Sequence, residues 1–281
     1  MKKLLCTLAV FSFCSYAFAQ TSLMAQREAV AAQGQKRMAL AAVATPLATS
    51  ACAYNFTSGS GDTFVKYCVT VNGNITQLEA PQGHEHIAWG AFGEGYNVCD
   101  NSTHPSVGYF DYADFGDSGT WGAPTLLNQT ATSVKIARTS TDGIWTLTQT
   151  ITDVISTGTI NVTMVVKNNT TADRFTTLQR YADVDADGKF LNNFDETPRV
   201  AFGWNPSAFG FDNGGLQILN VGTTPFTHAA VSHPSPVGPT CTQPADVGTE
   251  TQVDGSIVMI YFIQKIPAGK SVSMTMAYKG L

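Results

Sequence analysis

Apolar residues recur at every second position over several long stretches of this 281-residue chain. The pattern covers segments 134–137, 160–166 and 272–278, where residues such as Val162 and Met276 alternate with mostly polar neighbours. Successive side chains of a β-strand point to opposite faces, so this alternation places one face on a core and the other in water. No long helical pattern competes with it. The sequence therefore predicts an all-β fold.

The predicted strands extend from residue 51 to residue 281, which is too long for one immunoglobulin-sized sandwich of about 100 residues. Two separate domains would need a polar linker near the middle of this region. The middle, segment 143–184, instead contains some of the most regular strands of the chain. In segment 257–263 the odd-numbered and the even-numbered positions are all apolar, as in a central strand that is covered on both faces. We therefore expect a single large antiparallel β-sandwich with long loops, including a Pro-rich excursion over residues 231–248.

The first 19 residues have the features of a secretory signal peptide. Lys2 and Lys3 precede an apolar run, and Ala17-Phe18-Ala19 forms a small-x-small cleavage site. Residues 20–50 are rich in Ala and Gln and are expected to form a flexible or partly helical lead-in to the domain at 51–281. No later segment reaches about 18 consecutive apolar residues, so no transmembrane segment is expected. These features predict a secreted or periplasmic protein.

The cysteines that follow the signal peptide are Cys52, Cys68, Cys99 and Cys241. Four cysteines allow three pairings. The segment between Cys52 and Cys68 resembles a hairpin, and a symmetric turn centred on Ser60 would place the two cysteines opposite each other, within disulfide reach. This register pairs Cys52 with Cys68 and leaves Cys99 to pair with Cys241.

Three aspartates stand at alternate positions in segment 180–188 and are followed by Gly188. Calcium takes roughly six to eight oxygen ligands, which a short acidic loop with a glycine turn can supply. The D-x-D-x-D-G run resembles the calcium loops of EF-hands and of similar sites in secreted proteins, although Phe194 stands where an EF-hand has glutamate. The predicted structural Ca²⁺ site comprises Asp183, Asp185, Asp187, the carbonyl of Lys189, Asp195 and Glu196. The alternative is a solvated acidic turn.

Two further groups of residues contain side chains suited to metal binding or catalysis. His84 and His86 flank Glu85 and would lie on one face of a strand, a spacing used by some metal sites; the alternative is a pair of half-exposed strand histidines. Carboxylates interleaved with aromatic residues are also typical of sugar-handling clefts, or of a Gly-rich loop folded on its own sheet. The carboxylates in question are Glu94, Asp100, Asp111, Asp114 and Asp117. Spacing alone identifies no catalytic pair, so whether the protein is an enzyme stays open.

Segments 67–75, 93–96 and 181–187 resemble an exported bacterial all-β family without an assigned activity. In size and strand content the domain is similar to the supersandwich of galactose mutarotases and related carbohydrate-active proteins, a resemblance that implies fold and not function. The formal charge is −5 and basic residues are dispersed, which argues against nucleic acid as a partner.

The sequence thus favours an exported, calcium-stabilised β-sandwich that binds polysaccharide or another envelope component. The first alternative is a carbohydrate-active enzyme, such as an epimerase, lyase or hydrolase. It would use acids among Glu94, Asp111, Asp114 and Asp117, with His84 or His86 as a further candidate. The second alternative is a purely structural surface protein.

Overall fold

The computed structural model describes residues 52–87, 93–113, 116–209, 212–222, 227–232, 241 and 248–281. All of these residues fall within one compact unit, Leu47–Leu281. The predicted signal peptide (1–19) and lead-in (20–50) lie outside the described residues. No helix in the described part of the chain has the length and apolar character needed to cross a membrane.

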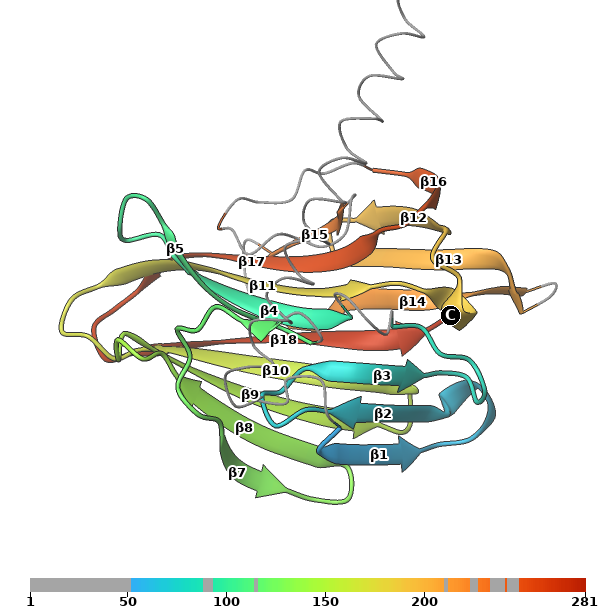
Figure 1. Ribbon diagram of the computed structural model, residues 1–281, viewed down its shortest axis with the longest axis horizontal. Helices are drawn as coiled ribbons and strands as arrows, with labels where there is room; N and C mark the ends of the chain where they lie inside the picture. The colour runs from blue at the N-terminus through green and yellow to red at the C-terminus, as the bar shows by residue number, and fades with distance from the viewer. Residues whose placement is uncertain are drawn as a thin grey trace, which may run out of the picture. The chain divides into compact units, whose positions relative to one another are not determined.

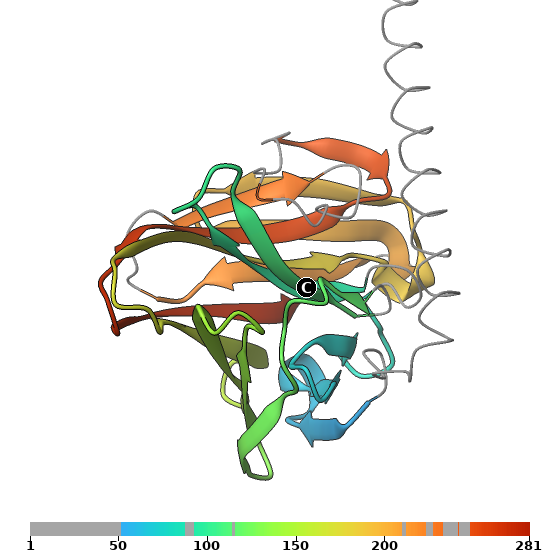
Figure 2. The ribbon, with the colours of Figure 1, turned by 60° about the vertical axis from the view of Figure 1, so that its left-hand side comes forward.

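The described strands form three antiparallel sheets (Figures 1 and 2). The largest has nine strands in the order β16-β12-β13-β14-β18-β10-β9-β8-β7. Its strands are β7 (Thr125–Gln129), β8 (Ser133–Thr139), β9 (Trp145–Val154), β10 (Thr159–Asn168), β12 (Asn192–Thr197), β13 (Val200–Phe209), β14 (Asp212–Asn220), β16 (Glu250–Val253) and β18 (Ser271–Gly280).

The second sheet has six strands in the order β15-β17-β11-β4-β5-β6, and the third has the order β1-β2-β3. The six strands are β4 (Glu94–Asp100), β5 (Val107–Tyr112), β6 (Gly116–Asp117), β11 (Arg174–Asp183), β15 (Thr227–Ser232) and β17 (Ser256–Ile266). The small sheet consists of β1 (Tyr54–Ser58), β2 (Val65–Val69) and β3 (Ile75–Glu79). Two short 3₁₀ turns complete the described elements, η1 (Gly61–Thr63) and η2 (Ala186–Gly188).

The predicted alternation appears directly in the burial of the strands. Along β9 and β10 buried and partly buried residues alternate without a break until Lys167. Side chains from all three sheets meet in one core, to which the small sheet contributes Tyr67, the six-stranded sheet Met259 and the nine-stranded sheet Met276. The predicted all-β sandwich is confirmed.

Strand β17 is buried on both faces, as its apolar sequence predicts. Met259 and Tyr261 join the main core, whereas Val258 and Ile260 pack on the opposite face of the sheet with residues such as Tyr181. The six-stranded sheet therefore has apolar contacts on both of its faces.

Both predicted disulfides are present, joining Cys52 to Cys68 and Cys99 to Cys241. The predicted hairpin register is wrong, however, because Cys68 lies opposite Asn55 and not opposite Cys52. The connection between β1 and β2 comprises residues 59–64 and contains η1, so it is longer than the turn over residues 58–61 that the sequence suggests. Gly59 and Gly61 in this connection have positive φ angles of 71° and 53°. The disulfide instead joins the chain just before β1 to the middle strand of the small sheet.

Candidate functional site

The acidic segment and the histidine motif, which are separate in the sequence, meet at the end of β11. Ile87 and Val184 form an isolated antiparallel bridge. Beside this bridge the Asp185 N–H donates to His86 O at 3.1 Å. The connection between β3 and β4 is thus held along the chain that leaves β11, which places two candidate motifs side by side.

His84 and Asp187 form the side-chain contact between these motifs. His84 Nδ1 lies 3.0 Å from Asp187 Oδ2 and 3.2 Å from Oδ1, across 103 residues of sequence. The Asp187 N–H also donates to Glu85 O at 2.7 Å. Asp187 has a positive φ of 55° and Gly188 one of 71°, so the two residues form the left-handed turn that the Asp-Gly sequence favours.

Burial perturbs the ionisable groups around this contact. Desolvation, with a further contribution from the negative charge of Asp254, raises the pKa of Asp185 to about 6. Desolvation also raises the pKa of Glu85 above its usual range, although its carboxylate accepts hydrogen bonds from the N–H groups of Leu78 and Ile87. Desolvation lowers the pKa of His86. This end of β11 therefore carries carboxyl groups whose ionised forms are disfavoured.

The residues predicted to bind calcium are divided among several local contacts. Asp187 pairs with His84, and the carbonyl of Lys189 accepts a 2.6 Å hydrogen bond from Asn192 Nδ2. Among the described residues, no three His, Cys, Asp or Glu side chains form a group that could hold a metal ion. The calcium site therefore stays a prediction.

The two acidic residues expected to close the calcium site, Asp195 and Glu196, lie on β12. Asp195 Oδ1 accepts hydrogen bonds from the Glu196 N–H at 2.8 Å and from Thr249 Oγ1 at 3.1 Å. Its contacts thus connect β12 to the chain before β16.

The candidate catalytic acid Glu94 lies deep inside the sandwich and is 0% exposed. It accepts hydrogen bonds from Arg180 Nε, from the Ile75 N–H at 2.8 Å and from Tyr278 OH at 2.9 Å. Desolvation raises the pKa of Glu94, and the positive charge of Arg180 opposes that shift. The three donors come from three different sheets, so this carboxylate connects the layers of the fold.

A second candidate acid, Asp111, is also 0% exposed. It forms an ion pair with Arg138 and accepts a 2.9 Å hydrogen bond from Asn72 Nδ2. Of the other two acids named for the enzyme alternative, Asp114 lies outside the described residues, and Asp117 is described only as backbone in β6. The two acids whose side chains are described are therefore enclosed and ion-paired.

This buried network surrounds the turn between β2 and β3. Arg180 Nη2 donates to Gly73 O at 3.0 Å, while Tyr96 OH and Gln149 Nε2 donate to Asn72 O at 3.0 and 3.1 Å. The space that convergent acids and arginines might offer to a ligand is thus occupied by the chain itself. We interpret the network as an anchor for the small sheet.

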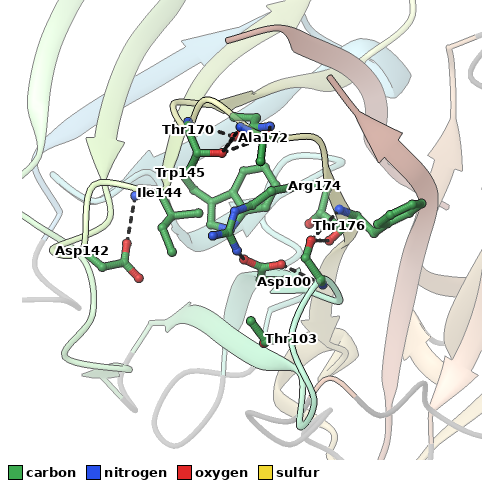
Figure 3. Close-up of polar contacts among 12 residues, drawn as sticks. Asp100, Thr103, Asp142, Ile144, Trp145, Thr170, Ala172, Arg174 and Thr176 are labelled. Carbon is green, nitrogen blue, oxygen red and sulfur yellow. Dashed lines mark hydrogen bonds and ion pairs between the residues drawn. The ribbon is translucent and has the colours of Figure 1, made fainter. Parts of the chain in front are cut away.

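A further polar cluster lies where β4 ends and β11 begins (Figure 3). Asp100 is buried and accepts a 2.5 Å hydrogen bond from Arg174 Nη1. Asp142, in the turn between β8 and β9, accepts hydrogen bonds from Ser140 Oγ and Tyr109 OH, both at 2.6 Å. Desolvation opposes ionisation of Asp142, but these donors and the Ile144 N–H together lower its pKa. The cluster joins loops at this end of the sandwich.

The outward face of β13 carries an aromatic group that sequence analysis did not identify. Ala201 is part of the core, and a Cβ atom at Gly203 would meet the core residue Phe194. The alternate residues Phe202, Trp204 and Pro206 therefore lie on the outward face. The rings of Phe202 and Trp204 are stacked, with centroids 5.4 Å apart and an interplanar angle of 30°. Both are partly exposed and Pro206 is exposed. We call these three residues the outer β13 strip.

Polar side chains border the outer β13 strip on both sides. On β12, Asn193 lies opposite Trp204 and Asp195 opposite Phe202. On β14, Gln217 also lies opposite Phe202. Asn193 Oδ1 accepts hydrogen bonds from Gln252 N and Nε2 at 3.0 and 3.2 Å, which fixes its position. The alternation of small and aromatic residues over 201–204 is the sequence signal for this face.

No protein-family model matches the chain, and no curated protein sequence matches it. Its fold is similar to part of a bacterial glucoamylase solved in complex with acarbose, with 10% identity, a TM-score of 0.52 and coverage of 82% of this chain and 33% of that chain. The chain thus spans about a third of the length of that glucoamylase. At this identity the likeness concerns the fold alone, and it agrees with the predicted sandwich.

Two galactose mutarotase-like structures align with the chain at lower TM-scores than the glucoamylase. A galactose mutarotase-like protein from Lactobacillus casei is 10% identical, with a TM-score of 0.46 and coverage of 81% of this chain and 100% of that chain. A galactose mutarotase-related enzyme from Lactobacillus acidophilus is 10% identical, with a TM-score of 0.44 and coverage of 81% and 97%.

Proposed function

We propose that this chain is an exported carbohydrate-binding β-sandwich whose binding face is the outer β13 strip. The observation that carries the proposal is the stacked, partly exposed pair Phe202 and Trp204. Aromatic side chains supply large apolar contact surfaces, and the C–H groups of a pyranose can pack against them. Because each ring restrains the other, little side-chain freedom remains to be lost on binding.

The neighbouring polar groups suit the hydroxyl groups of a sugar. Asn193 and Gln217 each carry amide donors and acceptors, and Asp195 accepts hydrogen bonds through its carboxylate. These three side chains are partly exposed and border the outer β13 strip through the strand pairings. A mixture of ring surface and neutral amides favours a neutral, polyhydroxylated ligand over a strongly charged one.

Catalysis by the predicted acids has less support. A glycosidase needs two carboxyl groups that flank its substrate, roughly 5 to 10 Å apart with open space between them. Glu94 and Asp111 are instead fully buried and paired with Arg180 and Arg138. The burial of these two acids favours the binding role over the enzyme alternative.

Two other findings support the proposal. The fold resembles part of a glucoamylase solved with acarbose, a carbohydrate-related protein. The two disulfides suit the oxidising environment of an exported protein, in agreement with the signal-peptide features of residues 1–19.

The test is a binding assay with a glycan array and with insoluble cellulose, chitin and starch. We expect the wild type to bind at least one of these, and Trp204→Ala to weaken that binding at least tenfold, or about 1.4 kcal/mol. Phe175→Ala is the matched control, because Phe175 is also an exposed aromatic residue but lies on β11. Equal binding by Trp204→Ala and the wild type would refute the outer β13 strip as the binding face.

A further inference from the structure

The outward face of the nine-stranded sheet continues beyond the outer β13 strip. Gln217 on β14 lies opposite Phe202, and Lys279 on β18 lies opposite Gln217. Thr159 on β10 lies opposite Lys279 in turn. These four residues form a row across β13, β14, β18 and β10, strands that follow one another in this order in Figure 1. We call them the cross-strand row.

Burial fixes the face of the sheet on which the cross-strand row lies. Gln217, Lys279 and Thr159 are each partly exposed. Their neighbours along the strands belong to the core, and these are Leu216 and Ile218 on β14, Tyr278 on β18 and Ile160 on β10. Because successive side chains of a strand point to opposite faces, the whole row lies on the outward face with Phe202.

The polar groups on the two sides of the outer β13 strip differ in what they already bind. On the β12 side, Asn193 and Asp195 accept hydrogen bonds from residues at β16 and just before it. On the β14 side, the Gln217 amide and the Lys279 ammonium group have no hydrogen-bond or ion-pair partner within the described part of the chain. The donors that a sugar can engage without displacing another residue therefore lie toward β18.

The surface beyond Lys279 is rich in hydroxyl groups. Outward positions of β9 and β10 carry Thr146, Thr148, Thr150, Thr152, Thr159 and Thr163. No carboxylate occupies an outward position of either strand. Threonine side chains are stiff at χ1, so a ligand that lies on them removes little side-chain freedom. This surface can therefore continue a contact that begins at Phe202.

We infer that a bound polysaccharide lies across the strands, from the outer β13 strip over Gln217 and Lys279 toward β10, and not along β13. This inference rests on the proposed carbohydrate-binding function and adds the direction and the length of the ligand. Neighbouring strands are about 4.8 Å apart, so the three spacings from β13 to β10 cover about 14 Å. A pyranose unit is similar in length to one such spacing, so each strand contacts about one sugar.

This direction assigns different roles to Trp204 and Lys279. Trp204 belongs to the outer β13 strip and contacts every bound chain. Lys279 lies two strands away from Phe202 and contacts only chains of about three units or more. Its ammonium group carries three hydrogen-bond donors for the hydroxyl groups of the sugar that reaches it.

The experiment measures dissociation constants for soluble ladders of two to six sugars prepared from cellulose, chitin and starch. For the wild type we expect affinity to rise with chain length on the ladder that binds. Lys279→Ala should weaken binding of the hexasaccharide at least fivefold and leave the disaccharide within twofold. Trp204→Ala should weaken binding of all lengths.

Lys167→Ala is the matched control for Lys279→Ala. Lys167 also occupies an outward position of this sheet, but it stands eight residues after Thr159 on β10, about 27 Å away at about 3.4 Å per residue. We expect it to change no affinity. Lys279→Gln should retain hexasaccharide binding within twofold of the wild type, because its amide still donates hydrogen bonds. Thermal unfolding of each variant checks that the fold is retained.

The outcomes separate this inference from the proposed function. If Trp204→Ala weakens binding but Lys279→Ala does not, the strip binds sugar and the direction across the strands is wrong. An equal effect of Lys279→Ala on long and short chains, or the same loss in Lys167→Ala, also overturns the inference. No effect of Trp204→Ala overturns the proposed function, and no binding of any ladder by the wild type counts against both.

Discussion

Arg180 donates through Nε to Glu94 inside the sandwich, and neither side chain is accessible to solvent. Arg180 also donates to Gln149 Oε1 at 2.5 Å and to Gly73 O at 3.0 Å. The pair thus connects β4 and β11 with β9 and with the turn of the small sheet. Two buried charges are tolerated here because several hydrogen bonds replace the water that each has lost.

Removing one partner of this pair should destabilise the protein strongly. Glu94→Ala leaves Arg180 buried without its counter-ion, and we expect a loss of about 3 to 5 kcal/mol in the free energy of unfolding. Urea unfolding monitored by tryptophan fluorescence measures this loss. The exposed ion pair between Lys265 and Asp173 is the control, because Lys265→Ala should change the urea midpoint little. A similar small change for Glu94→Ala would contradict the role assigned to the network.

Asp142 should contribute to stability in a pH-dependent way. Its pKa is lowered in the folded state, so its contribution is present above the ordinary aspartate pKa of about 4 and is lost as the pH falls through the lower, folded value. Asp142→Asn removes the titrating group, and the variant should lose less thermal stability than the wild type between pH 5 and pH 3. Calorimetry across this range provides the measurement. Parallel pH profiles for the two proteins would be inconsistent with a lowered pKa.

The two disulfides should contribute unequally to stability. The Cys52–Cys68 bond spans 16 residues and the Cys99–Cys241 bond spans 142 residues. On the chain-entropy estimate, their removal costs about 3 and about 5 kcal/mol. Replacing each pair with alanine and measuring urea unfolding should give the larger loss for Cys99–Cys241. The reverse order would show that strain or residual structure in the unfolded chain outweighs loop length.

Calcium binding at the end of β11 predicts sensitivity to chelation. If Asp183, Asp185 and Asp187 hold an ion, adding calcium to chelator-treated protein should raise the thermal midpoint, and Asp185→Ala should abolish the rise. Titrating calcium into both proteins while recording thermal unfolding provides the measurement. A wild-type midpoint that is unchanged by calcium would favour the acidic turn, in which the Asp187 side chain pairs with His84.

The strands could be predicted because their information is local. Alternation at Val162, Met164 and Met276 requires only that one face of a strand be buried, and the structure confirms that burial. The register at Cys68 could not be obtained in this way. It depends on how many residues the turn contains, and here the turn comprises residues 59–64 and includes η1.

The candidate site required information that sequence spacing does not contain. The sequence makes Glu94 a candidate for catalysis, but its partner Arg180 lies 86 residues further along the chain. The contact between His84 and Asp187 joins two motifs that are 103 residues apart, and nothing in the sequence of either motif indicates the other. The sequence gives only a weak signal for Phe202 and Trp204, because small residues, and not large apolar ones, occupy the inward positions of β13.

The turn at Asn72 and Gly73 has a consequence for the order in which this protein assembles. Its carbonyl groups accept hydrogen bonds from Tyr96, Gln149 and Arg180, which belong to β4, β9 and β11. The small sheet is made before all three of these strands during synthesis, yet its final contacts exist only after they have come together. The earliest part of the described fold to leave the ribosome therefore cannot complete its native contacts until β9 and β11 have been synthesised.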